Sequence, residues 1–203
     1  MRRYSTTPLH AGYDSAYRVS VLNTSAINSD VSVADTIHQM MHVVRFAQGS
    51  PRVKDAVRDA IEGLSKLHTT DKEIASAVYY WIKQHVKFTE DEVINKQMLG
   101  MSDYDAMDTE LLITPDVLLS MQQPMGDCDD FSTLCASMMM MLGFKAAFVT
   151  IAADASIPDV FSHVYVKVWL DDTNHGLYMD CSHGLYPGWE HGYYTRKKEW
   201  AIN

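Results

Sequence analysis

Basic residues are scarce in this sequence relative to acidic ones. Its 203 residues include 17 Lys and Arg against 26 Asp and Glu, which gives a formal net charge of −9. Proteins that hold nucleic acid or anionic lipid through charge need clustered Lys and Arg, and the sequence shows no such cluster. We therefore expect no nucleic-acid partner and no membrane partner. The one short basic run, at 196–198, is interpreted as a solvated tail.

Cysteine and long apolar runs are also sparse. The three cysteines, Cys128, Cys135 and Cys181, are an odd number, so at least one thiol is free. The first residues lack the apolar core of a signal peptide, which favours a reducing cytoplasm as the location. The longest nearly apolar stretch, 136–153, is interrupted in its middle by a glycine and a lysine. It therefore predicts a buried helix followed by a buried strand, not a membrane span.

The composition predicts one compact domain. Hydrophobic residues make up 47% of the chain, enough for a single core at this length. Residues 1–33 are rich in Ser, Thr and Asn and predict an irregular N-terminal arm with a short strand near 17–22. The single domain, 34–203, is expected to contain a helical layer at 34–86, a surface excursion at 87–123 and a core at 124–195.

Three helices are predicted in the N-terminal layer from apolar residues at helical spacing. The segments are 37–44, 53–64 and 74–82. Ser50 followed by Pro51 provides a cap and a first-turn proline, and Thr70 with Glu73 fits a capping box. We therefore expect each helix to turn an apolar stripe toward the core.

The core is predicted to be a helix followed by strands. The helix begins at Cys128 and ends near Gly143, and strands follow at 145–153, 162–170 and 177–180. In the second strand His163 lies on the face opposite the valines, so His163 and Asp180 should meet at the open end of a hairpin. Their direct opposition would need a turn centred at 171–172, or a bulge nearer Gly176.

A cysteine opening a helix, then a histidine and an aspartate on successive strands, is the order of nucleophile, base and orienting acid in one class of cysteine enzymes. A helix N-terminus and a nearby imidazolium both favour the thiolate of Cys128. The neighbouring Asp127, Asp129 and Asp130 act against it. Asp180 would fix the tautomer of His163 so that its other nitrogen faces the sulfur.

Acyl transfer also needs donors for the developing oxyanion. The Cys128 backbone N–H is one candidate, and Gln122, six residues upstream, is a second. Gln123 is an alternative, and both glutamines could equally be ordinary polar residues before Pro124. Each triad member has a plain structural explanation as well, but their order and setting favour catalysis.

Neither a metal nor another cofactor is expected. His38 and His42 share a helix face at metal-ligand spacing, but Gln39 stands where a zinc protease has its glutamate. We interpret them as helix-surface histidines. The aspartates at 127, 129 and 130 do not have the spacing of a calcium loop, and the methionines at 138–141 are interpreted as core packing.

The segment 126–180 resembles the core of the transglutaminase-like superfamily, a branch of the papain-like cysteine-enzyme fold. The resemblance rests on the Gly-x-Cys helix start at 126–128, the histidine strand and the aspartate strand. It implies an α+β fold with a central cysteine-bearing helix on an antiparallel sheet. Cys128 would be the nucleophile, His163 the base and acid, and Asp180 the orienting residue.

The wider layout of residues 35–195 resembles small transglutaminase-like proteins encoded near virion genes of tailed phages. The shared features are the helices before the core, Gly-Asp-Cys-Asp-Asp at 126–130 and Pro-Gly-Trp at 187–189. The sequence departs from many members, which have an aromatic residue after the cysteine and a tryptophan soon after the histidine. Here those places hold Asp129 and Val164-Tyr165.

The sequence thus predicts a cysteine hydrolase or acyltransferase that acts on an amide or peptide bond of a protein or peptide through a thioester. Hydrolysis of a virion protein or cell-wall peptide is preferred over cross-linking, and the host cytoplasm or the virion is the expected location. The alternative is a structural or assembly protein of a phage particle that binds other virion proteins with little or no catalysis. A cytoplasmic amidase unrelated to phage is a third reading.

Overall fold

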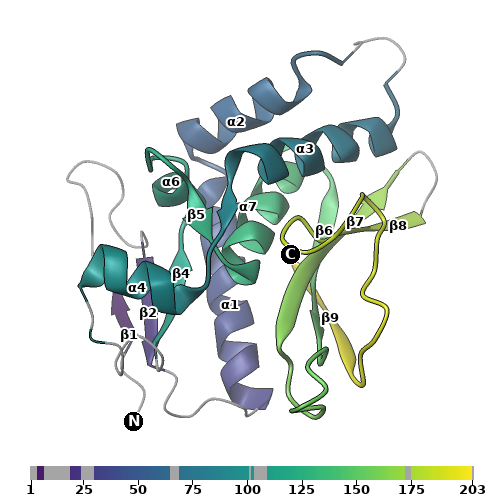
Figure 1. Ribbon diagram of the computed structural model, residues 1–203. Coiled ribbons are helices and arrows are strands. Elements are labelled where there is room, and N and C mark those ends of the chain that lie inside the picture. Colours follow the sequence, from purple (N-terminus) through teal and green to yellow (C-terminus); the bar gives the residue numbers. More distant parts are fainter. Residues whose placement is uncertain are drawn as a thin grey trace.

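Helix α7 (Cys128–Met141) lies at the centre of the fold. In the computed structural model, one side of α7 packs against a β-sheet, and three helices from earlier in the chain pack around the rest (Figure 1). Its residues 129–139 are all buried, and Gly143 follows with a φ of 92°, which favours glycine. The structure describes residues 4–6, 19–23, 30–64, 69–100, 102, 109–171 and 175–202.

The three predicted helices of the N-terminal layer are confirmed. They are α1 (Asp30–Ala47), α2 (Pro51–Ile61) and α3 (Asp71–His85). The Ser50 hydroxyl accepts a hydrogen bond from the Val53 N–H at 3.3 Å. Thr70 and Glu73 form the capping box, since each side chain accepts a hydrogen bond from the backbone N–H of the other. All three helices contact α7, so the layer encloses the cysteine-bearing helix.

The sheet beside α7 is antiparallel, in the order β8-β7-β6-β9. Its strands are β6 (Lys145–Ile151), β7 (His163–Leu170), β8 (His175–Met179) and β9 (Lys197–Ile202). Val164, Val166 and Val168 of β7 are buried in the core that contains α7, as the alternation of β7 predicted. The α+β class, with a cysteine-bearing helix on an antiparallel sheet and a helical layer before it, is confirmed.

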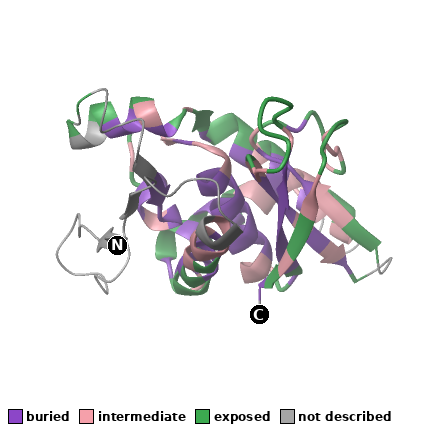
Figure 2. Cartoon of the chain, turned by 90° about the horizontal axis from the view of Figure 1, so that it is seen from below, coloured by how far each residue is buried: buried purple, intermediate pink, exposed green. Residues whose placement is uncertain are grey.

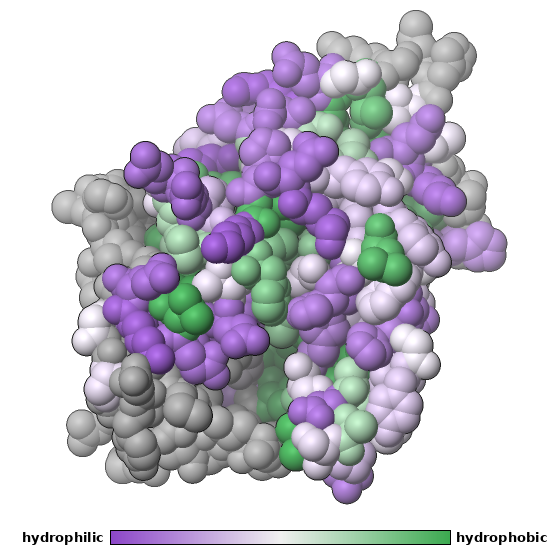
Figure 3. Space-filling model, viewed as in Figure 1, coloured by the Kyte–Doolittle hydropathy of each residue, from purple (hydrophilic) through white to green (hydrophobic). Residues whose placement is uncertain are grey.

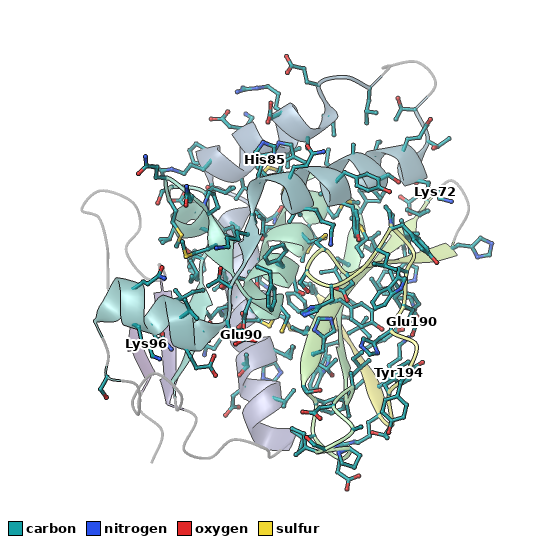
Figure 4. All side chains as sticks on the ribbon, viewed as in Figure 1. Lys72, His85, Glu90, Lys96, Glu190 and Tyr194 are labelled. Carbon is teal, nitrogen blue, oxygen red and sulfur yellow. The ribbon has the colours of Figure 1, made fainter. Side chains whose placement is uncertain are left out.

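The basic run at 196–198 is not the expected solvated tail, because Lys197 and Lys198 belong to β9. The Lys197 ammonium contacts the Glu190 carboxylate and donates to the Tyr178 hydroxyl at 2.9 Å. Tyr194 also donates to Glu190, at 3.3 Å (Figure 4). These contacts lie on the face of the sheet opposite α7, where the Glu190 carboxylate compensates the charge of Lys197 and the Tyr178 hydroxyl accepts one of its hydrogen bonds.

The described part of the segment 87–123 contains more regular structure and more buried residues than the predicted surface excursion. It contains β3 (Lys87–Phe88), α4 (Asp91–Leu99), β4 (Thr109–Ile113) and α6 (Pro115–Leu118). Asp91 and Asn95 of α4 are buried, so polar residues occupy positions where the sequence pattern would require apolar ones. For this reason the sequence pattern did not predict α4 as a helix. Leu111, Leu112 and Ile113 are fully buried.

A small sheet contains part of the predicted N-terminal arm. Strands β1 (Tyr4–Thr6) and β2 (Val19–Asn23) join β4 in the antiparallel order β1-β2-β4. The predicted strand at 17–22 therefore overlaps β2, while 17–18 and most of the arm lie outside the described residues. Two carboxylates satisfy N–H groups of β4: Asp91 accepts from Leu111 at 2.5 Å and Asp130 from Ile113 at 2.7 Å.

Burial follows this arrangement. Buried residues gather in the middle of the molecule, and exposed ones line the outer surfaces of the helices and the ends of the sheet (Figure 2). Among the helices of the described ranges, none has the length and apolar character required to cross a membrane. The stretch at 136–153 forms the end of α7 and then β6, as predicted.

Candidate active site

Cys128 is the first residue of α7 and is half-buried. Asp127 is the N-cap, and its carboxylate accepts a hydrogen bond from the Asp129 N–H at 3.2 Å. First-turn N–H groups have no acceptor within their own helix and form the positive end of its dipole. The position of Cys128 therefore favours a thiolate at its sulfur.

The chain enters α7 through β5 (Met125–Gly126), which pairs in parallel with β3. A Cβ atom on Gly126 would lie 2.5 Å from a carboxylate oxygen of Asp130, so only glycine fits. Asp130 is fully buried and holds the Ile113 N–H. The glycine two residues before Cys128 thus lets β5 pass close to the Asp130 side chain of α7, the one that binds β4.

The structure brings His163 and Asp180 together. Their side chains are only 9% and 2% exposed, and His163 Nε2 lies 2.8 Å from Asp180 Oδ2. Val166 opposes Met179 in the hairpin, so Asp180 is the diagonal neighbour of His163 on the same face of the sheet, not its direct partner. The pairing therefore needs neither a turn centred at 171–172 nor a bulge nearer Gly176.

Both oxygens of the Asp180 carboxylate accept hydrogen bonds. Oδ2 pairs with His163, while Oδ1 accepts from the Ser182 hydroxyl and from the His183 N–H, each at 2.9 Å. Burial raises the pKa of Asp180, but the hydrogen bond and charge of His163 and the two Oδ1 bonds outweigh it and lower the pKa to about 2. Asp180 is therefore a carboxylate at neutral pH, and with Nε2 bound to it, the nitrogen of His163 left for another partner is Nδ1.

A hydrogen bond joins the cysteine helix to the histidine strand. The Ser132 hydroxyl of α7 donates to the Val164 carbonyl of β7 at 3.0 Å. Residues four apart share a face of a helix, so Cys128 lies one turn before Ser132 on the face of α7 that contacts β7. Val164 directly follows His163 in the strand. Cys128 and His163 therefore belong to elements that this bond holds in a fixed register.

The loop after Asp180 is anchored by α3. The Tyr79 hydroxyl and the Lys83 ammonium both donate to the Gly184 carbonyl, at 2.6 and 2.8 Å. Burial and the negative charge of Asp180 raise the pKa of Tyr79, which keeps its hydroxyl proton in place as a donor. A Cβ on Gly184 would lie 2.4 Å from the Asp180 carbonyl oxygen. The loop is thus both bonded and tightly packed.

His183 is a site residue that sequence reasoning missed. Its ring centroid lies 4.9 Å from that of His163 and 4.7 Å from that of Phe88. Partial burial of its ring and the positive charge of His163 lower the pKa of His183. His163, Asp180 and His183 each offer one possible ligand atom, and the three atoms lie within 4.8 Å of one another. The structure has a turn at 181–183, and no pattern in the sequence predicted that it would bring His183 to the pair.

The remaining candidate residues differ in how far they are buried. Gln122 and Gln123 are both exposed in the turn before β5. Burial, a hydrogen bond to the Cys135 thiol and nearby negative charge raise the pKa of Cys181, so this buried thiol stays protonated. His38 and His42 are exposed on α1, as expected of helix-surface histidines.

Figure 3 shows the outer surface on this side of the molecule. Hydrophobic side chains lie at the bottom of a hollow between α4 and the larger sheet, and mostly hydrophilic ones surround it (Figure 3).

Asp91, Asp127 and Asp130 form a second close group, with possible ligand atoms within 4.8 Å of one another. These acids beside the helix start oppose the effect of the dipole on Cys128.

Comparison with solved structures finds similar chains at low identity. A TGase is 15% identical with a TM-score of 0.41, over 83% of this chain and 36% of its own. A provisionally assigned cysteine protease from Cytophaga hutchinsonii is 14% identical with a TM-score of 0.42, over 81% and 49%. A structure of Rad4-Rad23 crosslinked to an undamaged DNA is 11% identical with a TM-score of 0.39, over 81% of this chain and 42% of its own. The chain thus spans between about a third and a half of the length of these proteins.

Comparison by sequence gives a family. No curated protein sequence matches the chain. The family model of the transglutaminase-like superfamily matches residues 58–176, which is more than half of the chain. The matched region contains Cys128 and His163 and ends four residues before Asp180. By this match, the chain belongs to the transglutaminase-like superfamily.

Proposed function

We propose that the protein is a cysteine hydrolase or acyltransferase that acts on an amide or peptide bond through a thioester. The observation that carries the proposal is the buried bond from His163 Nε2 to Asp180 Oδ2, which leaves Nδ1 as the base. The helix that begins at Cys128 supports it, because it is tied to the His163 strand through Ser132 and Val164. In this proposal Cys128 is the nucleophile, His163 the general base and acid, and Asp180 the orienting residue.

The proposed reaction proceeds in two halves. His163 Nδ1 accepts the thiol proton of Cys128, and the thiolate attacks the carbonyl carbon of the amide. The oxyanion accepts hydrogen bonds from the Cys128 N–H and, we propose, from Gln122. His163 then gives its proton to the leaving amine as the C–N bond breaks. In hydrolysis, water then attacks the thioester and releases the acid. In transamidation, an amine attacks the thioester in place of water.

We propose a protein or peptide as the substrate and hydrolysis as the preferred outcome, because water suffices as the acceptor. The sequence at 126–130 and the Pro-Gly-Trp at 187–189 support a phage-encoded protein that acts in the host cytoplasm or in the virion. Mass spectrometry of purified virions from a phage that encodes the chain tests this location. The protein should be found there in a constant ratio to capsid protein, or else only in the infected cell.

Exposed large hydrophobic side chains favour a second candidate function, a structural or assembly role in the virion. Leu185 is 72% exposed, Tyr186 55% and Tyr193 50%, and all three belong to the segment that follows the site. Solvent-exposed aromatic groups of this kind are common where proteins bind neighbours. In that case other virion proteins would be the partners, and the cysteine would contribute little catalysis.

Thiol labelling separates the two candidate functions. Native protein and its Cys128→Ala variant are treated with an iodoacetamide probe near neutral pH, and labelled residues are mapped by mass spectrometry. We expect rapid labelling of Cys128 and slow labelling of the buried Cys135 and Cys181. The His163→Ala variant should lose the rapid reaction and keep its circular dichroism spectrum. Uniformly slow labelling of the native protein would instead favour the structural role.

A further inference from the structure

The mechanism above gives His183 no role, although it stands against both His163 and Asp180. Its ring meets the His163 ring edge to face, with an interplanar angle of 84°. The three side chains offer two imidazole nitrogens and one carboxylate oxygen within 4.8 Å of one another. We propose that His163, Asp180 and His183 bind a divalent transition metal such as Zn²⁺, and that the bound metal switches off Cys128.

The donor set suits zinc. Zinc takes imidazole nitrogen and carboxylate oxygen at about 2.0–2.2 Å, and three protein ligands with an open fourth position are common. Two ligands of a tetrahedral zinc lie roughly 3.3 Å apart. The 2.8 Å between His163 Nε2 and Asp180 Oδ2 must therefore widen by about half an ångström. Calcium and magnesium prefer sites made of oxygen, and this cluster offers one carboxylate.

The surroundings of His183, the third proposed ligand, leave it open to solvent and restrict its orientation. His183 is exposed, so a metal ion can reach it from solvent. Its ring also packs edge to face on Phe88, which restricts its orientation. Asp180 Oδ1 stays bonded to Ser182 and to the His183 N–H, so Oδ2 can turn from His163 to a metal while the carboxylate stays oriented.

Metal binding would remove the base. The neutral His163 ring has one proton, which lies on Nε2 when that atom donates to Asp180. A metal at Nε2 needs the lone pair of that atom, so the proton moves to Nδ1 with no net gain or loss on the ring. Nδ1 then cannot accept the thiol proton of Cys128. This regulatory half rests on the proposed function, whereas metal binding itself does not.

Metal binding is tested by calorimetry, in which the full chain is first stripped of metal with EDTA and then titrated with zinc chloride. We expect one zinc per chain, and at least tenfold weaker binding in the His183→Ala and His183→Gln variants. His191→Ala is the matched control, because His191 lies in the same segment with its Nδ1 bonded to the Tyr193 carbonyl. Absence of binding, or equal affinity in the His183 variants, would overturn the proposal.

The switch is tested by the alkylation rate of Cys128 with zinc present and after EDTA is added. We expect zinc to slow the reaction at least tenfold in native protein, and much less in His183→Ala. Zinc binding that depends on His183, with no rapid reaction of Cys128 in metal-free protein, would refute the proposed function and leave the metal site standing. Rapid reaction that zinc leaves unchanged would refute the switch and leave the function standing.

Discussion

The Ser132 hydroxyl donates to the Val164 carbonyl across 3.0 Å, and this bond connects the helix of the candidate nucleophile to the strand of the candidate base. Both residues are buried. A buried carbonyl that loses its donor costs about 1–3 kcal/mol. The bond therefore contributes to stability and also fixes how α7 sits along β7.

We expect Ser132→Ala to lower stability by about 1 kcal/mol and to slow the neutral-pH alkylation of Cys128 by about tenfold. Ser137→Ala is the matched control. Ser137 is also buried in α7, but its hydroxyl donates at 2.7 Å to Thr133 within the same helix. Urea denaturation and alkylation kinetics on both variants make the comparison. Equal alkylation rates in the two variants would contradict a positioning role for Ser132.

Asp180→Asn should change the response of stability to acid. The folded pKa of Asp180 is about 2 and its ordinary value is 3.8, so the carboxylate stabilises the fold above the ordinary value. That contribution, about 2 kcal/mol, is lost as pH falls through the folded pKa. We expect the native protein to lose it between about pH 5 and pH 2, and the variant to lack this component in urea denaturation.

The same substitution should slow the reaction of Cys128 by on the order of 10³-fold, because an amide cannot stabilise the imidazolium of His163. Asp154→Asn is the control. Like Asp180, Asp154 accepts hydrogen bonds from the residue two positions later, here the N–H and hydroxyl of Ser156. Asp154, however, is exposed. An unfolded Asp180→Asn protein at neutral pH would show a structural role instead.

Tyr79→Phe should loosen the loop that follows Asp180. The substitution removes the 2.6 Å bond from the Tyr79 hydroxyl to the Gly184 carbonyl, and we expect a loss of about 1–2 kcal/mol. Tyr80→Phe is the control, because Tyr80 is the next residue of α3 and is 47% exposed. Amide hydrogen exchange over 180–184 should rise in Tyr79→Phe alone. Unchanged exchange would mean that Lys83 holds the loop without Tyr79.

Gly184→Ala should impair the site through sterics alone. The new Cβ would lie 2.4 Å from the Asp180 carbonyl oxygen and 3.1 Å from the Tyr79 hydroxyl, so the backbone must shift. We expect at least a tenfold slower Cys128 reaction and a lower unfolding midpoint. Gly192→Ala meets nothing within 4 Å and should match the native protein in both measurements. A normal Gly184→Ala protein would show that the loop tolerates movement.

Sequence alone predicted the elements whose pattern matches their surroundings. The helix from Cys128 and the alternating strand after His163 turn apolar residues to one shared core, so their periodicity could be read directly. Helix α4 could not, because Asp91 and Asn95 occupy its inner face. Strand β9 could not either, because the charge of Lys197 is compensated by Glu190, a contact made only after folding.

The candidate site shows the same division. The residues Cys128, His163 and Asp180 could be named from their order along the chain. Sequence does not determine hairpin register, so the diagonal pairing of His163 with Asp180 needed the structure. His183 reaches the pair through the turn at Asp180 Oδ1, and no periodicity indicates where such a side chain points.

The bond between Asp130 and the Ile113 N–H links the folding of two parts of the molecule. The carboxylate belongs to α7 and the amide to β4, so β4 gains this partner only when the central helix docks. The small sheet and the helix should therefore order together, as one cooperative unit. The amide of Ile113 then exchanges with solvent only when the start of α7, and Cys128 with it, comes away.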